Sequence, residues 1–334
     1  MLLGNKDNSL CERKKKMTKQ TERERDLKNL RKLQDEGMAS KHLTDDDLES
    51  ILDNLSEARK SLGKSKCTYF EIIKKIQLAS FGRNKDLDVL VYDPDPMVRG
   101  MVAKRGRNQD LDILANDSDL RVQRCVIEQG RDKDLDVFVN SESIGIRVAV
   151  AQQGRGKDLD ILILDKDPSV RKAVALQGRD KDLDVLVDDK SPLVRAAVAL
   201  QGRDQDLDKL VKDKDRLVRS NVALVGRDKD LDQLVHDLDM EVRTSVAAVG
   251  RGKDLDMLVH DKDAWVREIV ADQGRNHDLD ILVFDPNPWV RMKVAWQCRD
   301  KDLDILADDP NEDVRETTAY IRKHLKVNGN PLLK

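Results

Sequence analysis

Aspartate side chains recur two residues apart along much of this chain, and this spacing is the one that most directly suggests chemistry. Asp132, Asp134 and Asp136 have the spacing of the first ligands of a calcium-binding loop. Such a loop needs glycine at its next position, where this chain has Val137, and it ends on a bidentate glutamate that is absent here. We therefore expect these carboxylates to cap helix starts and interact with helix dipoles, and we predict no metal site.

The other side chains capable of chemistry are equally isolated. His236 and His260 occupy equivalent places in neighbouring sequence repeats, and two imidazoles so far apart do not make a metal site. No serine–histidine–aspartate, cysteine–histidine or glycine-rich phosphate signature is present. We therefore predict a non-catalytic protein without a cofactor. The four cysteines lack the spacing of a zinc or iron–sulfur site and are expected to be free thiols: Cys11, Cys67, Cys125 and Cys298.

The composition is unusual for a globular protein. Of 334 residues, 37% are charged and 3% are aromatic, which argues against one large aromatic core. The net charge is −3, and because residues 1–81 have an excess of basic side chains, the remainder is acidic. A long nucleic-acid channel needs the opposite balance. No stretch reaches the roughly 18 apolar residues of a membrane span, so we expect a cytoplasmic protein with no membrane partner.

These charges belong to a repeat of 24 residues without insertions. Ten copies fill residues 82–321, so the chain is expected to be a stacked array of one small motif. Repeat positions are numbered from the first residue of each copy. The first residues are Gly82, Gly106, Gly130, Gly154, Gly178, Gly202, Gly226, Gly250, Gly274 and Cys298.

Each repeat contains the start signals of two helices. Repeat position 14 is always a residue that can cap a helix, such as Asp167, and position 15 is proline in four copies, such as Pro168. The helix that begins there is expected to end at the next glycine, Gly178. An earlier helix begins at position 3, is about two turns long, and is either α or 3₁₀. Leucine and valine at positions 6, 9, 10, 17 and 21 supply a core only when repeats stack.

The segment LDVLVDDKSPLVRAAVA resembles the leucine-rich repeat variant and the related HEAT-like repeats, in which an aspartate-containing turn is followed by Val-Arg-x-x-Val-Ala. The resemblance implies an all-α fold, a right-handed α-solenoid of ten two-helix repeats with an N-terminal helical cap. An iron–sulfur cluster reported for the variant family has no matching cysteines here and is not expected.

Arginine at repeat position 18 and aspartate at position 12 recur almost without exception. A partner is not periodic, whereas an interface between similar neighbours must repeat. A guanidinium can hold two or three oxygens at once, so we predict that these residues form a structural ladder between repeats. The proposed ladder comprises Arg171, Arg195, Arg219 and Arg243 with Asp165, Asp189, Asp213 and Asp237.

Repeat positions 16 and 23 vary most and are expected to be partly exposed on one stripe of the second helix. All three tryptophans of the chain lie there, in two adjacent repeats. An exposed aromatic cluster is typical of a protein-binding site, and packing between repeats or beneath the terminal segment is the alternative. The predicted partner-binding residues are Trp265, Trp289, Trp296, Tyr320, Leu193, Leu200, Leu217 and Leu224.

The two ends lie outside the repeat. We expect a disordered tail at residues 1–18, a helical cap at 19–81 and a polar extension at 322–334. A docking domain remains an alternative for residues 19–81. In the tail, three consecutive lysines could contact an acidic partner: Lys14, Lys15 and Lys16.

The sequence thus predicts a scaffold that binds a protein or peptide along the stripe of the second helix. The alternative is a nucleic-acid-binding protein, because the resemblance extends to HEAT-like proteins that act in DNA repair as glycosylases. That function would require a basic face made of Lys104, Arg105, Arg121 and Arg124 and their neighbours.

Overall fold

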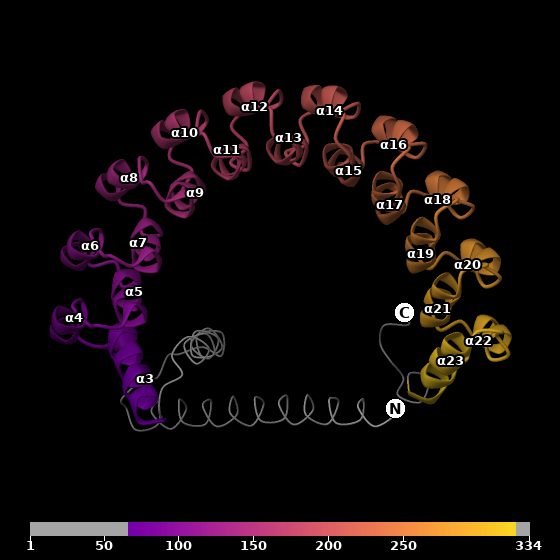
Figure 1. Ribbon diagram of the computed structural model, residues 1–334, viewed down its shortest axis with the longest axis horizontal. Coiled ribbons are helices and arrows are strands. Elements are labelled where there is room, and N and C mark those ends of the chain that lie inside the picture. Colours follow the sequence, from indigo (N-terminus) through magenta and orange to yellow (C-terminus); the bar gives the residue numbers. More distant parts are fainter. Residues whose placement is uncertain (1–65, 325–334) are drawn as a thin grey trace, which may run out of the picture. The chain divides into compact units, whose positions relative to one another are not determined.

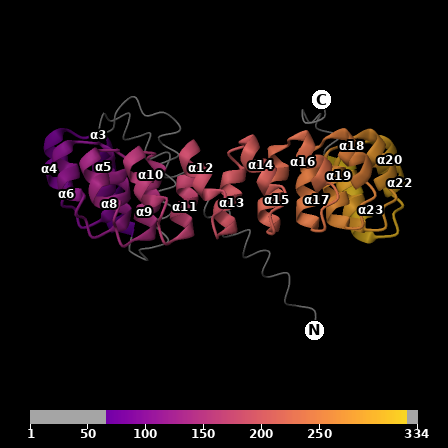
Figure 2. The ribbon, with the colours of Figure 1, turned by 90° about the horizontal axis from the view of Figure 1, so that it is seen from above.

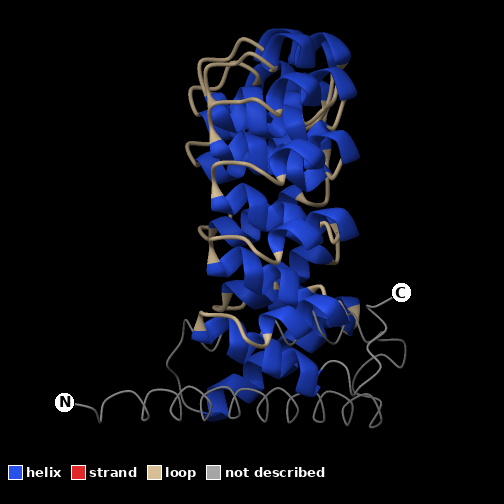
Figure 3. Ribbon diagram, turned by 90° about the vertical axis from the view of Figure 1, so that its right-hand side faces the viewer, coloured by secondary structure: helices blue, strands red, loops and turns tan. Residues whose placement is uncertain are grey.

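The computed structural model of this chain describes residues 66–324, and all regular structure within that range is helical (Figure 3). The helices expected before residue 66, the tail at 1–18 and residues 325–334 of the expected extension lie outside the described range. Helix α3 (Lys66–Phe81) leads into the first repeat and packs on the helices of that repeat. The all-α fold of two-helix repeats is confirmed.

The first helix of every repeat has seven residues, begins at repeat position 3 and is α-helical rather than 3₁₀. These helices are α4 (Asn84–Leu90), α6 (Asn108–Leu114), α8 (Asp132–Phe138), α10 (Gly156–Leu162), α12 (Asp180–Leu186), α14 (Asp204–Leu210), α16 (Asp228–Leu234), α18 (Gly252–Leu258), α20 (Asn276–Leu282) and α22 (Asp300–Leu306).

The second helix of each repeat begins at repeat position 15 and is longer than the first helix. These helices are α5 (Pro96–Lys104), α7 (Leu120–Ile127), α9 (Ile144–Gln152), α11 (Pro168–Ala175), α13 (Pro192–Ala199), α15 (Arg216–Val225), α17 (Met240–Val249), α19 (Ala264–Asp272), α21 (Pro288–Trp296) and α23 (Glu312–His324).

Local side-chain chemistry sets these boundaries. The Asp167 carboxylate accepts a hydrogen bond from the Ser169 amide, and Pro168 occupies the first turn of α11, where no amide donor is needed. The chain then turns at Gly178, whose φ of 71° lies in the left-handed region. Cys298 takes the same conformation, with φ of 60°, in the tenth repeat.

The helices pack into two compact units, residues 1–153 and 154–334, of which the described parts hold repeats one to three and four to ten. Within the second unit, the odd-numbered helices α11 to α23 lie side by side along the inner side of the row, and the even-numbered helices lie outside them (Figures 1 and 2). The exposed surface of the inner layer therefore comes from the second helix of each repeat.

The core is the seam between these layers. In the fifth repeat, Leu183 and Leu186 from α12 meet Val194 and Val198 from α13, and all four are at most 1% exposed. The equivalent side chains are buried in the other repeats and are leucine or valine except for Phe138, Ile146 and Thr318. Burying each of these side chains contributes about 1.5–3 kcal/mol, so the core is stabilised by stacking many small contributions.

Candidate functional site

The arginine at repeat position 18 joins two neighbouring repeats. Arg195 on α13 donates through Nε and Nη2 to the two carboxylate oxygens of Asp213, at 2.6 and 2.8 Å. Its Nη1 donates to the main-chain carbonyl of Asp189, at 2.7 Å. Asp213 belongs to the next repeat and Asp189 to the same one, so a single guanidinium fixes two successive turns.

The same rung recurs along both units. Each predicted arginine binds the carboxylate of the aspartate one repeat further on, and the carbonyl of the aspartate in its own repeat. Asp165 takes part through its carbonyl, which accepts from Arg171. Gln123, which stands in place of arginine, still donates to the Asp117 carbonyl at 2.8 Å. The carboxylate pairs are Arg99 with Asp117, Arg171 with Asp189, Arg195 with Asp213, Arg219 with Asp237, Arg243 with Asp261, Arg267 with Asp285 and Arg291 with Asp309.

The side chains of the rungs are largely buried, and their surroundings shift the pKa values of the carboxylates. Burial alone raises the pKa of Asp189, but the Arg171 guanidinium and the Ser191 amide both donate to this carboxylate. The donors prevail, so the pKa of Asp189 lies below its ordinary value. Asp213 and Asp237 have lowered pKa values for the same reasons. The carboxylates are therefore held in the ionised form that the arginines require.

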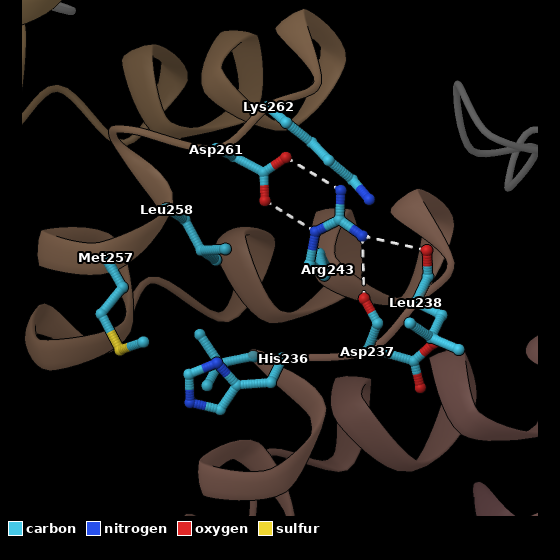
Figure 4. Close-up of a pocket in the computed structure, with 9 residues that line it drawn as sticks. His236, Asp237, Leu238, Arg243, Met257, Leu258, Asp261 and Lys262 are labelled. Carbon is cyan, nitrogen blue, oxygen red and sulfur yellow. Dashed lines mark hydrogen bonds and ion pairs between the residues drawn. The ribbon is translucent and has the colours of Figure 1, made fainter.

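Shallow hollows lie beside the rungs. Figure 4 shows Arg243 between the Asp261 carboxylate and the carbonyls of Asp237 and Leu238, with His236 at the rim of a hollow of about 320 Å³. A similar hollow of about 410 Å³ lies at the equivalent place beside Arg195. Because the hollow repeats with the ladder, it follows from repeat geometry and does not single out one ligand.

A second arginine ladder, at repeat position 2, was missed by the sequence reasoning. Arg203 donates through Nε and Nη2 to both carboxylate oxygens of Asp206, at 2.7 and 2.9 Å. It also forms an ion pair with Asp184 of the preceding repeat, at 2.8 Å, and donates to the Asp180 carbonyl. Asp206 is 3% exposed. Its carboxylate, at position 5, was expected to cap a helix, and it instead holds an arginine that links two repeats.

The predicted stripe lies wholly within the second unit and is exposed. Trp265 on α19, Trp289 and Trp296 on α21 and Tyr320 on α23 are between 49% and 64% exposed. The Trp296 and Tyr320 ring centroids lie 6.4 Å apart, within the range of paired aromatic rings. The leucines of α13 and α15, together with Leu200 just after α13, are 39% to 51% exposed. Neither group is buried between the repeats that the structure describes.

The charges around the aromatic residues are mostly acidic. Lys293 on α21 forms ion pairs with Asp272 at 2.9 Å and Glu268 at 3.8 Å, both on α19. Asp313 and Glu316 on α23 are exposed, and their side chains have no hydrogen bond or ion pair with any described residue. The ammonium group is thus neutralised locally, while two carboxylates face solvent.

The basic residues of the nucleic-acid alternative are largely occupied within the first unit. Arg121 pairs with Asp119 at 2.7 Å, Arg124 lies 3.8 Å from Glu128, and Arg105 donates to the Ser80 carbonyl. Lys104 is exposed at the end of α5. Two of the four are thus paired with carboxylates, whereas Lys104 and Arg105 form no ion pair with a described residue.

The remaining candidates show no reactive arrangement. Between residues 66 and 324, no three side chains of the metal-binding types gather into a possible site, and His236 and His260 are exposed. Burial raises the pKa of the Cys125 thiol, which makes it a poor nucleophile. None of the helices in this range is long and apolar enough to cross a membrane.

Comparisons with known proteins found similar chains among solved repeat structures. No family model and no curated protein matches this chain. A solved leucine-rich repeat variant, described as a novel repetitive structural motif, is 27% identical, with 61% of this chain and 87% of that chain covered and a TM-score of 0.49. A designed armadillo repeat protein in complex with the peptide (KR)4 is 16% identical, with 71% and 97% covered and a TM-score of 0.18. The described residues form an array of helical repeats, and the chain is similar to this leucine-rich repeat variant.

Proposed function

We propose that this chain is a non-catalytic scaffold that binds a protein or peptide partner along the stripe of the second unit. The observation that carries the proposal is the exposure of three tryptophans, a tyrosine and four leucines at two repeat positions of one helical layer. Exposed apolar side chains gathered on one helical layer are typical of interaction surfaces, and aromatic residues dominate the binding energy of such surfaces.

The distribution of the two kinds of residue supports the same assignment. Arginines and aspartates that recur in almost every repeat are engaged with neighbouring repeats, as Arg195 is with Asp213. Side chains that change from repeat to repeat, such as Leu193 and Trp265, point away from the core. A partner that binds in one register needs side chains that differ from repeat to repeat, and only the varying, exposed positions supply such side chains.

Site-specific photo-crosslinking tests this proposal. A photoreactive phenylalanine analogue replaces Leu217 or Trp265 in the stripe, and Phe284 serves as the matched control because it is 71% exposed in a turn outside the stripe. Crosslinks to one set of polypeptides are expected from both stripe positions and not from Phe284. Equal crosslinking from Phe284, or none from the stripe, would show that the surface is assigned wrongly.

A second experiment measures the contribution of the tryptophans. Affinity purification of the wild type beside the Trp265→Ala, Trp289→Ala double variant should recover the crosslinked polypeptides only with the wild type. Recovery of the same polypeptides by both proteins would contradict the proposed site.

A further inference from the structure

The aromatic part of the stripe differs from the leucine part in its charge, and this difference bears on the chemistry of the partner. We define the aromatic face as the exposed side of α19, α21 and α23 that carries Trp265, Trp289, Trp296 and Tyr320. We propose that the aromatic face binds a polypeptide segment bearing lysine or arginine side chains. This inference rests on the proposed function and specifies the partner of the same surface.

The fixed charges of the aromatic face are predominantly negative. At repeat positions 16, 19, 20 and 23 of the three helices, the charged side chains are four carboxylates and one ammonium. The ammonium, Lys293, is paired with Asp272 and close to Glu268, so it offers little attraction to an anion. Asp313 and Glu316 are exposed and have no partner among the described residues. Further along α23, Lys323 is also exposed, and with it the four carboxylates stand against two ammonium groups. A cation that approaches this face gains Coulomb energy, whereas a phosphate backbone is repelled.

The aromatic rings favour the same kind of ligand. The face of an indole ring carries negative electrostatic potential and attracts ammonium and guanidinium groups. Trp289 and Trp265 are each more than half exposed, so their rings are accessible. Tyr320 lies one helical turn after Glu316, and acid and ring therefore share one side of α23. Each can engage a different part of a long cationic side chain, whose methylene stem covers the ring edge.

The leucine part of the stripe lacks this character. Leu193, Leu200, Leu217 and Leu224 carry no charge, and Arg216 at the start of α15 is paired with Glu241 at 3.1 Å. We therefore expect the cationic preference to be confined to α19, α21 and α23, with the leucines contacting apolar side chains of the same partner.

Intrinsic fluorescence reports directly on this face, because the three tryptophans of the chain all lie on it. The full chain is titrated with a 12-residue peptide of alternating lysine and serine. Matched peptides replace lysine with acetyl-lysine, which keeps the stem and removes the charge, or with glutamate. A saturable change that weakens with added salt is expected for the lysine peptide, and little or none for the other two. Single-stranded oligothymidylate is also expected to leave the fluorescence unchanged.

Neutral variants test the role of the carboxylates. Combining Asp313→Asn with Glu316→Gln should weaken the lysine peptide by about three- to tenfold, since exposed charge pairs are individually modest. The matched control is Asp308→Asn, an exposed carboxylate in the turn of the same repeat, which should have no effect. Equal binding of the acetyl-lysine peptide, tighter binding of oligothymidylate, or an unchanged affinity in the double variant would overturn the inference.

These results separate the inference from the proposed function. If the stripe crosslinks a partner but the aromatic face shows no preference for lysine, the scaffold function stands and the cationic preference is wrong. If neither stripe position crosslinks any polypeptide, the proposed function fails, whatever the peptide titration shows.

Discussion

Arg195 and Leu193 lie two residues apart on α13, yet they belong to two different parts of the molecule. Arg195 is buried and holds two successive turns, and its equivalents do the same in the neighbouring repeats. Leu193 is 44% exposed, and its equivalents in the other repeats include methionine, arginine, glycine, serine, leucine, glutamate, tryptophan and aspartate. The comparison suggests a rule for repeat arrays. A charged residue that recurs at one repeat position indicates a structural contact. A repeat position whose residue varies indicates an exposed surface available for recognition.

Protonating all the rung aspartates at once should cause the largest loss of stability. The carboxylates of Asp189, Asp213 and Asp237 have pKa values below the ordinary one, so they add stability above about pH 4, the pKa of an unfolded aspartate. That stability is lost as the pH falls through their lower folded-state pKa values. Unfolding midpoints measured by circular dichroism should be steady between pH 6 and 8 and should fall steeply below pH 4. A midpoint that does not change down to pH 2.5 would contradict the ladder's contribution.

Removing a single rung should have the next largest effect. Arg195→Ala leaves the Asp213 carboxylate buried without its guanidinium, which is expected to cost about 3 kcal/mol in the free energy of unfolding. Leu193→Ala on the same helix should change stability by only about 0.5 kcal/mol. Urea unfolding of the two variants side by side provides the measurement, and similar losses in both would erase the distinction between the buried rung and the exposed stripe.

In the second ladder, a buried and an exposed carboxylate that bind the same arginine can be compared. Arg203 binds Asp206, whose side chain is 4% exposed, and Asp184, whose side chain is 57% exposed. Asp206→Ala should destabilise the chain by about 2 kcal/mol, because it removes the buried partner of a charged group. For Asp184→Ala, in contrast, we expect at most about 1 kcal/mol. The midpoints of thermal unfolding of the two variants provide the measurement. A larger loss for Asp184→Ala than for Asp206→Ala would contradict the assignment of Asp206 as the buried partner.

A small gain in stability is expected from replacing the first residue of the tenth repeat. Cys298 has a left-handed φ where the preceding repeats have glycine, and this conformation costs a residue with a Cβ about 1 kcal/mol. Cys298→Gly should therefore raise the unfolding midpoint slightly without altering partner binding. A lower midpoint in this variant would show that the Cys298 side chain contributes more than its backbone conformation costs.

Much of the fold follows from local rules that the sequence displays. The capping residue Asp167, the proline after it and the glycine at position 178 each act within a few residues, so helix boundaries were predictable. The sequence did not predict which aspartate each arginine of the ladder binds. In a perfect repeat, the spacing from Arg195 to Asp189 is as constant as the spacing to Asp213, and only the packed structure distinguishes them.

The second ladder was missed for a related reason. Asp206 lies in the first turn of α14, where capping and the helix dipole already account for an acidic residue, so its position in the sequence does not indicate a further partner. The signal that could have revealed this ladder is the arginine at repeat position 2, which is present in all ten repeats. The exposure of the stripe could be predicted from sequence variation, because buried positions in a close-packed seam tolerate few changes. The chemistry of a partner required the charges around each ring, which come from neighbouring helices.

We propose that the varying stripe binds the partner and that the recurring ladders hold the repeats together. The most direct measurement is the affinity of the crosslinked partner for Trp289→Ala and for Phe284→Ala, two exposed aromatic residues in the same repeat. Our account predicts a loss of about tenfold or more for Trp289→Ala, no loss for Phe284→Ala, and unchanged unfolding midpoints for both. Equal affinities for the two variants, or a loss confined to Phe284→Ala, would contradict it.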